Sequence, residues 1–311
     1  VRYANERQQF GRPISSFGAI RQKLADMAVH AYATESALYR CCQDMDNAIH
    51  ELKAGGADHA KAILKGVEQY AAEAAIMKVV GSECLDHVVD EAVQIYGGMG
   101  YRAESPVEPA YRHGRIYWIF EGTNEINRML TVDMLLKRAM KGQLDLLGPA
   151  QAVAAELMGI PDFPEPDDSL LAEETRIVAH FKKAVLMTAG GAAQTLGLEL
   201  AKHQETLMHI ADLVIDTYVA ESVLLRTLKL AGLKGASNVQ EQVAMCRLFI
   251  HDAADRMHKH TKEAVNNFAE GDEQRAMLMG AKRFTKSTNV NTAELRKLVA
   301  KKMIAEGKYG Y

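Results

Sequence analysis

Residues 17–45 read FGAIRQKLADMAVHAYATESALYRCCQDM, and the spacing of their apolar side chains predicts one long helix. These side chains recur every three or four residues, with one gap of seven, so they lie along one stripe of an α-helix. The members of this stripe are Phe17, Ile20, Leu24, Met27, Ala31, Leu38, Cys42 and Met45. A second stripe of this kind consists of Leu207, Ile210, Val214, Tyr218, Leu225 and Leu228.

The distribution of proline extends this pattern to most of the chain. The seven prolines lie at positions 13, 106, 109, 149, 161, 164 and 166, which leaves residues 14–105 and 167–311 without proline. Proline breaks helix interiors because it lacks an N–H group and collides with the preceding turn. Strand signals are weak, since β-branched runs are short and alternation is not sustained. The sequence therefore predicts an all-α protein built from helix bundles.

The segment GIPDFPEPDDS (residues 159–169) is typical of a linker. It contains three prolines and four acidic residues, a composition that resists packing into a core. We therefore expect a first helical domain at residues 1–142, a linker at 143–168 and a second helical domain at 169–311. Shorter breaks are predicted at KAGGADH (residues 53–59) and at ESPVEP (residues 104–109).

Composition excludes several classes of function. The net charge of −3 argues against a nucleic-acid partner. The four cysteines form no C-x-x-C pair, which predicts a reducing compartment and no metal framework. No apolar run approaches the length of a membrane span. These features predict a soluble, intracellular protein.

Two other patterns suggest sites that we consider weak. The histidines at 251, 258 and 260 are better explained by a solvated helix face than by a metal site, because positions 258 and 260 point in nearly opposite directions on a helix. The basic tail ELRKLVAKKM (residues 294–303) could lie on a membrane surface, but its few charges favour an ordinary surface helix.

Glu121 follows an unusually apolar run in IYWIFEGTNEINR (residues 116–128). Trp118, Ile119 and Phe120 would remove water from its carboxylate, which disfavours the charged form and makes the group a stronger base. A general base that works near neutral pH benefits from such a change. Alternatively, Glu121 or Thr123 caps a helix that begins nearby. The residues alone leave both interpretations open.

The glycine-rich segment QIYGGMGYRAESPVE (residues 94–108) also has two interpretations. Its glycines can end a helix in a left-handed conformation. They can also allow the backbone to approach a ligand closely. The spacing does not match G-x-G-x-x-G, and the segment follows a helical pattern rather than a strand, so a dinucleotide fingerprint is not indicated.

Two longer segments resemble one family. They are RYANERQQFGRPISSFGAIRQKLADM (residues 2–27) and DEAVQIYGGMGYRAESPVEPAYRHGRIYWIFEGTNEINR (residues 90–128). Both are similar to the C-terminal helical domain of the flavin-dependent acyl-CoA dehydrogenases. The remainder, including LMHIADLVIDTYVAESVLLR (residues 207–226), resembles the C-terminal extension of the very-long-chain branch. The chain begins without Met inside a helical pattern, so we expect an N-terminal part of the natural protein to precede it.

This resemblance implies a fold and a set of site residues. The fold is a four-helix up-and-down bundle followed by a second helical domain. Glu121 matches the catalytic base, which removes the α-proton of an acyl-CoA while the β-hydrogen passes to FAD. Thr123 and Glu125 match positions that touch FAD in the same subunit, although many relatives carry Gln at the latter. The positions that match contacts to the FAD of a neighbouring subunit are Arg7, Phe10, Gln94 and Gly98.

The same resemblance implies partners and a location. The partners are an acyl-CoA, for which the extension favours a long chain, an electron-transfer flavoprotein, and a second copy of the chain in a homodimer or a dimer of dimers. The location is the bacterial cytoplasm or the mitochondrial matrix. One alternative is a helical dimerisation or assembly module of the same family that has lost catalysis; another is an acyl-CoA oxidase. A scaffold has no need of Glu121, Arg7 and Gln94, and their presence together favours an enzyme.

Overall fold

Helix α2 (Gly18–Ala54) is the long helix that the first apolar stripe predicts. The structure is a computed structural model that describes residues 1–159 and 167–311. The buried face of α2 lies beside the predicted stripe: Leu38 and Cys42 are exposed, whereas Ala28 and Tyr32 are buried. The reason is that α2 is contacted by helices from both halves of the chain, and small alanine side chains let them approach.

The first half of the chain forms short elements followed by helices of very different length. They are α1 (Arg2–Glu6), β1 (Gln8–Gln9), β2 (Arg12–Pro13), η1 (Ile14–Ser16), α2, α3 (His59–Gln69), α4 (Ala71–Tyr96), α5 (Gly98–Tyr101), α6 (Glu108–Ile116) and α7 (Asn124–Met140). Helix α4 contacts α2, α6 and α7, and α2 and α7 are joined through helix α10 (Gln204–Lys234) of the second half, which contacts both.

The second half is also helical. Its elements are α8 (Leu147–Met158), α9 (Ala172–Leu196), η2 (Gly197–Lys202), α10 (Gln204–Lys234), η3 (Ala236–Asn238), α11 (Gln240–Phe268), α12 (Gly271–Phe284) and α13 (Thr292–Glu306). The all-α class is confirmed, because strands in the described residues are limited to the two-residue pair β1–β2.

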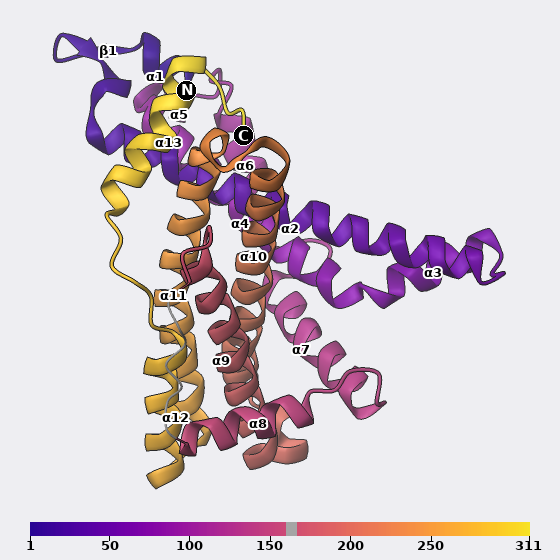
Figure 1. Cartoon of the computed structure of the whole chain (residues 1–311). Coiled ribbons are helices and arrows are strands. Elements are labelled where there is room, and N and C mark those ends of the chain that lie inside the picture. The colour runs from indigo at the N-terminus through magenta and orange to yellow at the C-terminus, as the bar shows by residue number, and fades with distance from the viewer. Residues whose placement is uncertain (160–166) are drawn as a thin grey trace.

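Helix α10 lies at the centre of the molecule. It packs against α9 and α11 of the second half, and against α2 and α7 of the first (Figure 1). Its buried residues come from all sides of the helix, and at one contact the Tyr32 hydroxyl lies 3.1 Å from Thr227 Oγ1. Buried residues of both halves consequently belong to one continuous core.

The predicted linker differs from the structure at its start. Helix α8 lies within residues 143–168 and is held by Glu156, whose carboxylate pairs with Lys183 of α9 and Arg283 of α12 at 2.7 and 2.8 Å. Residues 160–166, which include most of the proline-rich segment, lie outside the described residues. The division into two domains stays a prediction, although both halves share a core.

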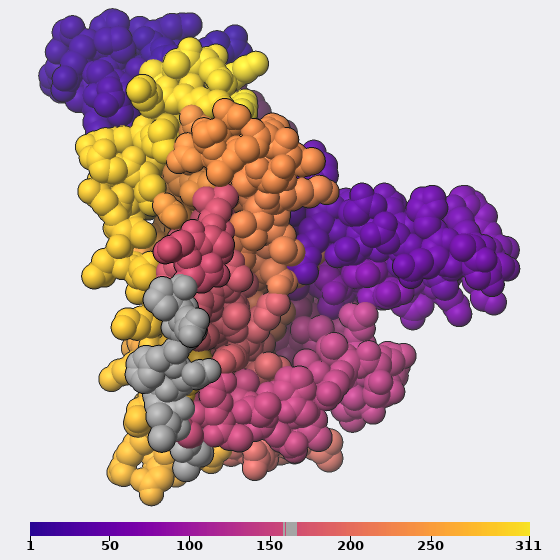
Figure 2. Space-filling view, in the orientation of Figure 1, coloured from indigo at the N-terminus to yellow at the C-terminus, as the bar shows by residue number. Residues whose placement is uncertain are grey.

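The last part of α2 and helix α3 form an arm that projects from the body of the molecule (Figures 1 and 2). The predicted break at residues 53–59 contains the turn between the two helices of this arm. Gly66 of α3 lies against Ile49 of α2, where a side chain on the glycine would collide with the isoleucine. None of the described helices is long and apolar enough to cross a membrane.

One half-buried histidine makes the stability of the fold depend on pH. The ring of His30 on α2 packs on that of His87 on α4, with centroids 4.4 Å apart. Burial, together with smaller effects of the nearby His87 and Arg256, lowers the pKa of His30 from 6.5 to about 4. Between these values the unfolded chain binds a proton that the folded chain does not, so stability falls as the pH falls.

We expect the His30→Gln substitution to reduce this dependence. In the wild type, the lowered pKa of His30 should reduce the free energy of unfolding by up to roughly 3 kcal/mol as the pH falls from 6.5 to 4. Urea denaturation across this range measures the effect, with His113→Gln, which alters an exposed histidine, as the matched control. Equal pH profiles for His30→Gln and the wild type would contradict the assignment.

Candidate functional site

The turn between α6 and α7 holds Glu121 in a strained conformation. Its φ is 56° and that of the following Gly122 is 79°. A positive φ at a residue other than glycine costs about 1–3 kcal/mol, and such residues cluster at functional sites. The turn is closed by the backbone N–H of Asn124, which donates to the carbonyl of Trp118 at 3.0 Å. The Glu121 side chain itself is exposed.

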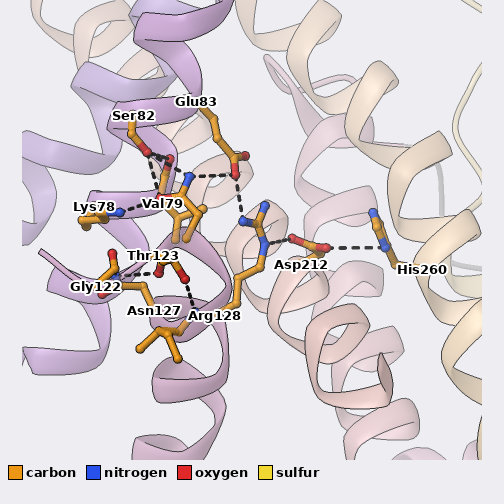
Figure 3. A network of polar contacts seen from close by, with 12 residues as sticks. Lys78, Val79, Ser82, Glu83, Gly122, Thr123, Asn127, Arg128, Asp212 and His260 are labelled. Carbon is orange, nitrogen blue, oxygen red and sulfur yellow. Dashed lines mark hydrogen bonds and ion pairs between the residues drawn. The ribbon is translucent and has the colours of Figure 1, made fainter. Parts of the chain in front are cut away.

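Two asparagines of α7 hold this turn in place through hydrogen bonds. Asn127 Nδ2 donates to the carbonyls of Gly122 and Thr123 at 2.8 and 3.1 Å (Figure 3). Asn124 is completely buried, and its side chain bonds to three residues of α4. These residues are Lys78, Ser82 and Glu83. The backbone beneath Glu121 is therefore attached to α4 through hydrogen bonds and is held in one place.

Thr123 caps the helix that follows. Its Oγ1 accepts from the N–H of Ile126 at 3.3 Å, whereas Glu121 makes no capping bond with any described residue. The capping alternative is therefore correct for Thr123 and wrong for Glu121. In the first turn of α7, the backbone N–H of Glu125 and then the Thr123 hydroxyl lower the pKa of the exposed Glu125 carboxyl. The carboxylate of Glu121 is left available for chemistry.

The apolar neighbours of Glu121 do not bury it within this chain. Ile119 and Phe120 are exposed, and Tyr117 packs edge-on against Phe120 with centroids 4.9 Å apart. The expected removal of water by these side chains is absent from the described residues. They instead form part of an apolar surface over α6, the turn and α7. Its other exposed members are Tyr111, Ile116, Ile126 and Leu130.

Arg7 and Phe10 belong to a small hairpin formed by β1 and β2. Phe10 has a φ of 53° at the tip and is 89% exposed, and Gly11 beside it has a φ of 76°. Arg7 is exposed where the chain enters the hairpin, and its guanidinium forms no ion pair with the described residues. The hairpin lies at the edge of the molecule (Figure 1).

Gln94 and Gly98 lie at the end of α4 beside the base of this hairpin. Tyr3 of α1 stacks on Tyr96 with ring centroids 3.9 Å apart, and its hydroxyl donates to the Tyr96 carbonyl at 3.1 Å. Both Gln94 and Gly98 are exposed. The structure thus brings the hairpin residues and the α4 residues to the same end of the molecule.

Three glycines lie at the C-terminal end of α4, and each position favours glycine for a different structural reason. Gly97 ends α4, as the helix-end interpretation predicts, but its φ of 62° and ψ of −145° lie outside the left-handed helical region. Gly100 is buried, and a Cβ there would lie 2.8 Å from the Val93 carbonyl, so its reason is packing within this chain. A Cβ on Gly98 would meet nothing within 4 Å. Space is equally open at Gly97, but the positive φ of Gly97 already explains that glycine, which leaves Gly98 as the candidate for close approach of another group.

The candidate residues form two separate groups. Glu121, Thr123 and Glu125 lie over the middle of α4, where Asn124 bonds to Ser82. Gln94 follows Ser82 by 12 residues in the same helix. At 1.5 Å per residue, the second group is about 18 Å further along the axis of α4.

Comparisons with known proteins agree with the sequence motifs. Two family models, each described as "Acyl-CoA dehydrogenase, C-terminal domain", match residues 1–136 and 180–283. A "Probable acyl-CoA dehydrogenase" of Bacillus subtilis is 39% identical over 308 residues, which are 99% of this chain and 52% of the relative. This chain belongs to the acyl-CoA dehydrogenase family.

Two further members of the acyl-CoA dehydrogenase family extend this comparison. A crystal structure from Bacillus anthracis, described as an acyl-CoA dehydrogenase complexed with FAD, matches with a TM-score of 0.95 and 40% identity, over 99% of this chain and 52% of its own. The mitochondrial very long-chain specific acyl-CoA dehydrogenase of Rattus norvegicus is 30% identical over 86% of this chain and 40% of the relative. The chain spans about half the length of the curated relatives it matches, which include bacterial and mitochondrial proteins.

The sequence did not predict the polar residues on α4 and α10 that form ion pairs with the acyl-CoA dehydrogenase motif. Arg128, at the end of the quoted segment, bonds to Glu83 of α4 and Asp212 of α10 (Figure 3). Its partner Asp212 follows 84 residues later, so local spacing gives no sign of the pair. Helical spacing gives one usable signal: Thr123 and Asn127 are four residues apart on one face.

The histidine prediction needs correction. His258 and His260 are half-buried and bonded: one nitrogen of His258 lies 3.0 Å from Thr285 Oγ1, and Nδ1 of His260 lies 3.0 Å from Nδ1 of His209. The solvated-face interpretation is wrong for both, because α11 is packed on several sides. Within residues 1–159 and 167–311, no cluster of three or more His, Cys, Asp or Glu could hold a metal ion.

We expect Gly122→Ala to destabilise the protein. A Cβ at this position would lie 3.1 Å from Asn127 Nδ2, and the φ of 79° is unfavourable for alanine. The free energy of unfolding should fall by about 1–2 kcal/mol. The matched control Gly98→Ala adds the same methyl group in open space at an ordinary φ and should change stability by less than about 0.5 kcal/mol. Urea denaturation measures both variants, and equal losses would contradict the strained turn.

Proposed function

We propose that the full-length protein containing this chain is an FAD-dependent acyl-CoA dehydrogenase with Glu121 as its catalytic base. It converts an acyl-CoA to the trans-2-enoyl-CoA in fatty-acid β-oxidation. The observation that carries this proposal is the exposed, strained Glu121 turn, which Asn124 and Asn127 hold in place on a chain of this family. A carboxylate held in this way can be presented to a substrate at small entropic cost.

The role of Glu121 is proton abstraction. Its carboxylate takes the weakly acidic α-proton of the thioester, and the electron pair left behind forms the α,β double bond. The chemistry that bound FAD supplies is acceptance of the β-hydrogen as a hydride. One proton and one hydride leave the substrate, which balances a two-electron oxidation.

The exposed candidate residues fit a bound FAD. The Arg7 guanidinium is free among the described residues to pair with a phosphate oxygen. Open space at Gly98 allows close approach to the cofactor, and Phe10 and Gln94 border the same end of α4. Thr123 and Glu125 belong to the group around Glu121, from which they can touch the FAD of their own subunit.

The separation of the two groups supports a homodimer. We assign Arg7, Phe10, Gln94 and Gly98 to the FAD of a neighbouring subunit, because they lie about 18 Å along α4 from the Glu121 turn. We also assign the apolar surface around Phe120 and Tyr117 to contact with the preceding half of the protein and the acyl chain. Such coverage would remove water from Glu121 and strengthen it as a base.

The remaining features of the proposal rest on resemblance. A long acyl chain is favoured because the second half resembles the very-long-chain branch, and an electron-transfer flavoprotein is the proposed electron acceptor. The proposed compartment is the bacterial cytoplasm or the mitochondrial matrix, because the relatives are bacterial and mitochondrial proteins.

The visible spectrum of the full-length protein tests this proposal. Anaerobic addition of palmitoyl-CoA should bleach the flavin band. A flavin band that persists would contradict the long-chain assignment and call for shorter acyl groups. A protein purified without flavin, and unable to take it up, would overturn the proposal in favour of an assembly module.

The Glu121→Gln variant should retain FAD and acyl-CoA binding but lose turnover by several orders of magnitude, because an amide cannot accept the α-proton. Steady-state rates and binding titrations on the full-length protein measure this. Glu104→Gln removes an exposed carboxylate that pairs with Arg102 at 3.4 Å, and it should retain normal turnover. Near-normal turnover in Glu121→Gln would remove Glu121 from the role of base.

The Arg7→Ala variant should hold FAD less tightly, because it removes a cation assigned to a phosphate oxygen. The flavin-to-protein absorbance ratio after dialysis measures retention. Arg2→Ala, which alters another exposed arginine of the same segment, is the matched control and should keep the wild-type ratio. Equal flavin content in the two variants would count against the Arg7 assignment.

A further inference from the structure

Arg128 connects the helix that follows Glu121 to the second half of the chain. It lies on α7 one turn after Asn124, and its side chain is 13% exposed. One guanidinium nitrogen lies 2.7 Å from Glu83 Oε1 on α4, and Nε lies 2.7 Å from Asp212 Oδ1 on α10. Figure 3 shows the guanidinium between these two carboxylates.

The same Glu83 oxygen also supports the Glu121 turn. Oε1 accepts a hydrogen bond from Asn124 Nδ2 at 3.1 Å, in addition to the bond from Arg128. Asn124 in turn closes the turn through its backbone bond to Trp118. A continuous path of hydrogen bonds therefore runs from the turn, through Asn124 and Glu83, to Arg128 and Asp212.

The charges of this path make Asp212 important for the geometry of Arg128. Asp212 Oδ2 also lies 3.7 Å from His260 Nδ1, but burial lowers the pKa of His260 even though Asp212 opposes this, so the ring is neutral at neutral pH. Arg128 is then the cation that contacts Asp212 within the described residues. Without Asp212, the guanidinium is attracted to Glu83 alone, and it competes with Asn124 for the shared oxygen.

We propose that Asp212 and Arg128 are positioning residues for Glu121, so that the second half of the chain sets the place of the catalytic carboxylate. This inference rests on the proposed function of Glu121. The contact path itself exists whatever the reaction is. Neither residue touches the substrate in this proposal; both act through Glu83 and Asn124.

Asp216 provides a matched control on the same helix. It lies one turn after Asp212 and pairs with Arg256 of α11 through nitrogen–oxygen distances of 2.7 and 3.1 Å. That ion pair is also partly buried, but it joins two helices of the second half and does not reach α7. Asp216→Asn therefore removes a similar ion pair without breaking the path to Glu121.

The experiment compares Asp212→Asn and Asp216→Asn in the full-length protein. Hydrogen exchange of a peptide covering residues 117–128 should be about 10-fold faster in Asp212→Asn and unchanged in Asp216→Asn. The rate constant for flavin reduction by palmitoyl-CoA should fall about 10-fold in Asp212→Asn, with flavin content and acyl-CoA affinity preserved. Asp216→Asn should stay within about 2-fold of the wild type.

A second variant covers the case in which Asp212→Asn does not fold. Arg128→Lys keeps the positive charge but offers one nitrogen instead of a planar fork, so it cannot bond Glu83 and Asp212 in the same way. It should give the same faster exchange at residues 117–128 and the same slower flavin reduction. If both variants fold, combining them should add little to either effect, because each breaks the same path.

Equal exchange and equal rates in Asp212→Asn, Asp216→Asn and the wild type would overturn the inference. Equal losses in both aspartate variants would also overturn it, because they would indicate general loosening of α10. The exchange measurement needs no flavin and no substrate. If wild-type flavin were not reduced by any acyl-CoA, the proposed function would fail while the exchange comparison still tested the path.

Discussion

The burial of α10 on all of its sides is the constraint on which the rest of the structure depends. Helices from the first half, α2 and α7, and from the second half, α9 and α11, must all fit around it. A polar group of such a helix loses water and needs a hydrogen bond to offset that cost; the buried hydroxyl of Tyr218 has none among the described residues. Asp212 meets this requirement with Arg128, and Thr227 meets it with Tyr32.

Much of the fold could be predicted from the sequence because helix formation leaves local signs. The proline-free tracts and the stripe in residues 17–45 predicted helices that the structure contains. Which face of α2 is buried could not be predicted from the stripe. Leu38 is exposed and Ala28 is buried because α2 is contacted from several directions, whereas one apolar stripe indicates a single packing surface.

The candidate site was also predictable only in part. Thr123 was recognisable as a helix cap from its residue type and its place before α7. The strain at Glu121 and the supporting bonds of Asn124 and Glu83 depend on where α4 lies, and no local pattern reports that. The predicted loss of water around Glu121 failed within this chain because the neighbouring apolar side chains face outward. Their function depends on whatever covers them.

The arm formed by the end of α2 and by α3 lies outside the core that joins the other helices. Residues beyond Ala37 of α2, and all of α3, take no part in the continuous core. The turn between Ala54 and His59 is exposed for most of its length. Added length in such a turn costs little, because loop-closure entropy rises slowly with the number of residues. The arm is therefore where a foreign domain or an affinity tag could be inserted, and where relatives can differ in length while the core remains the same.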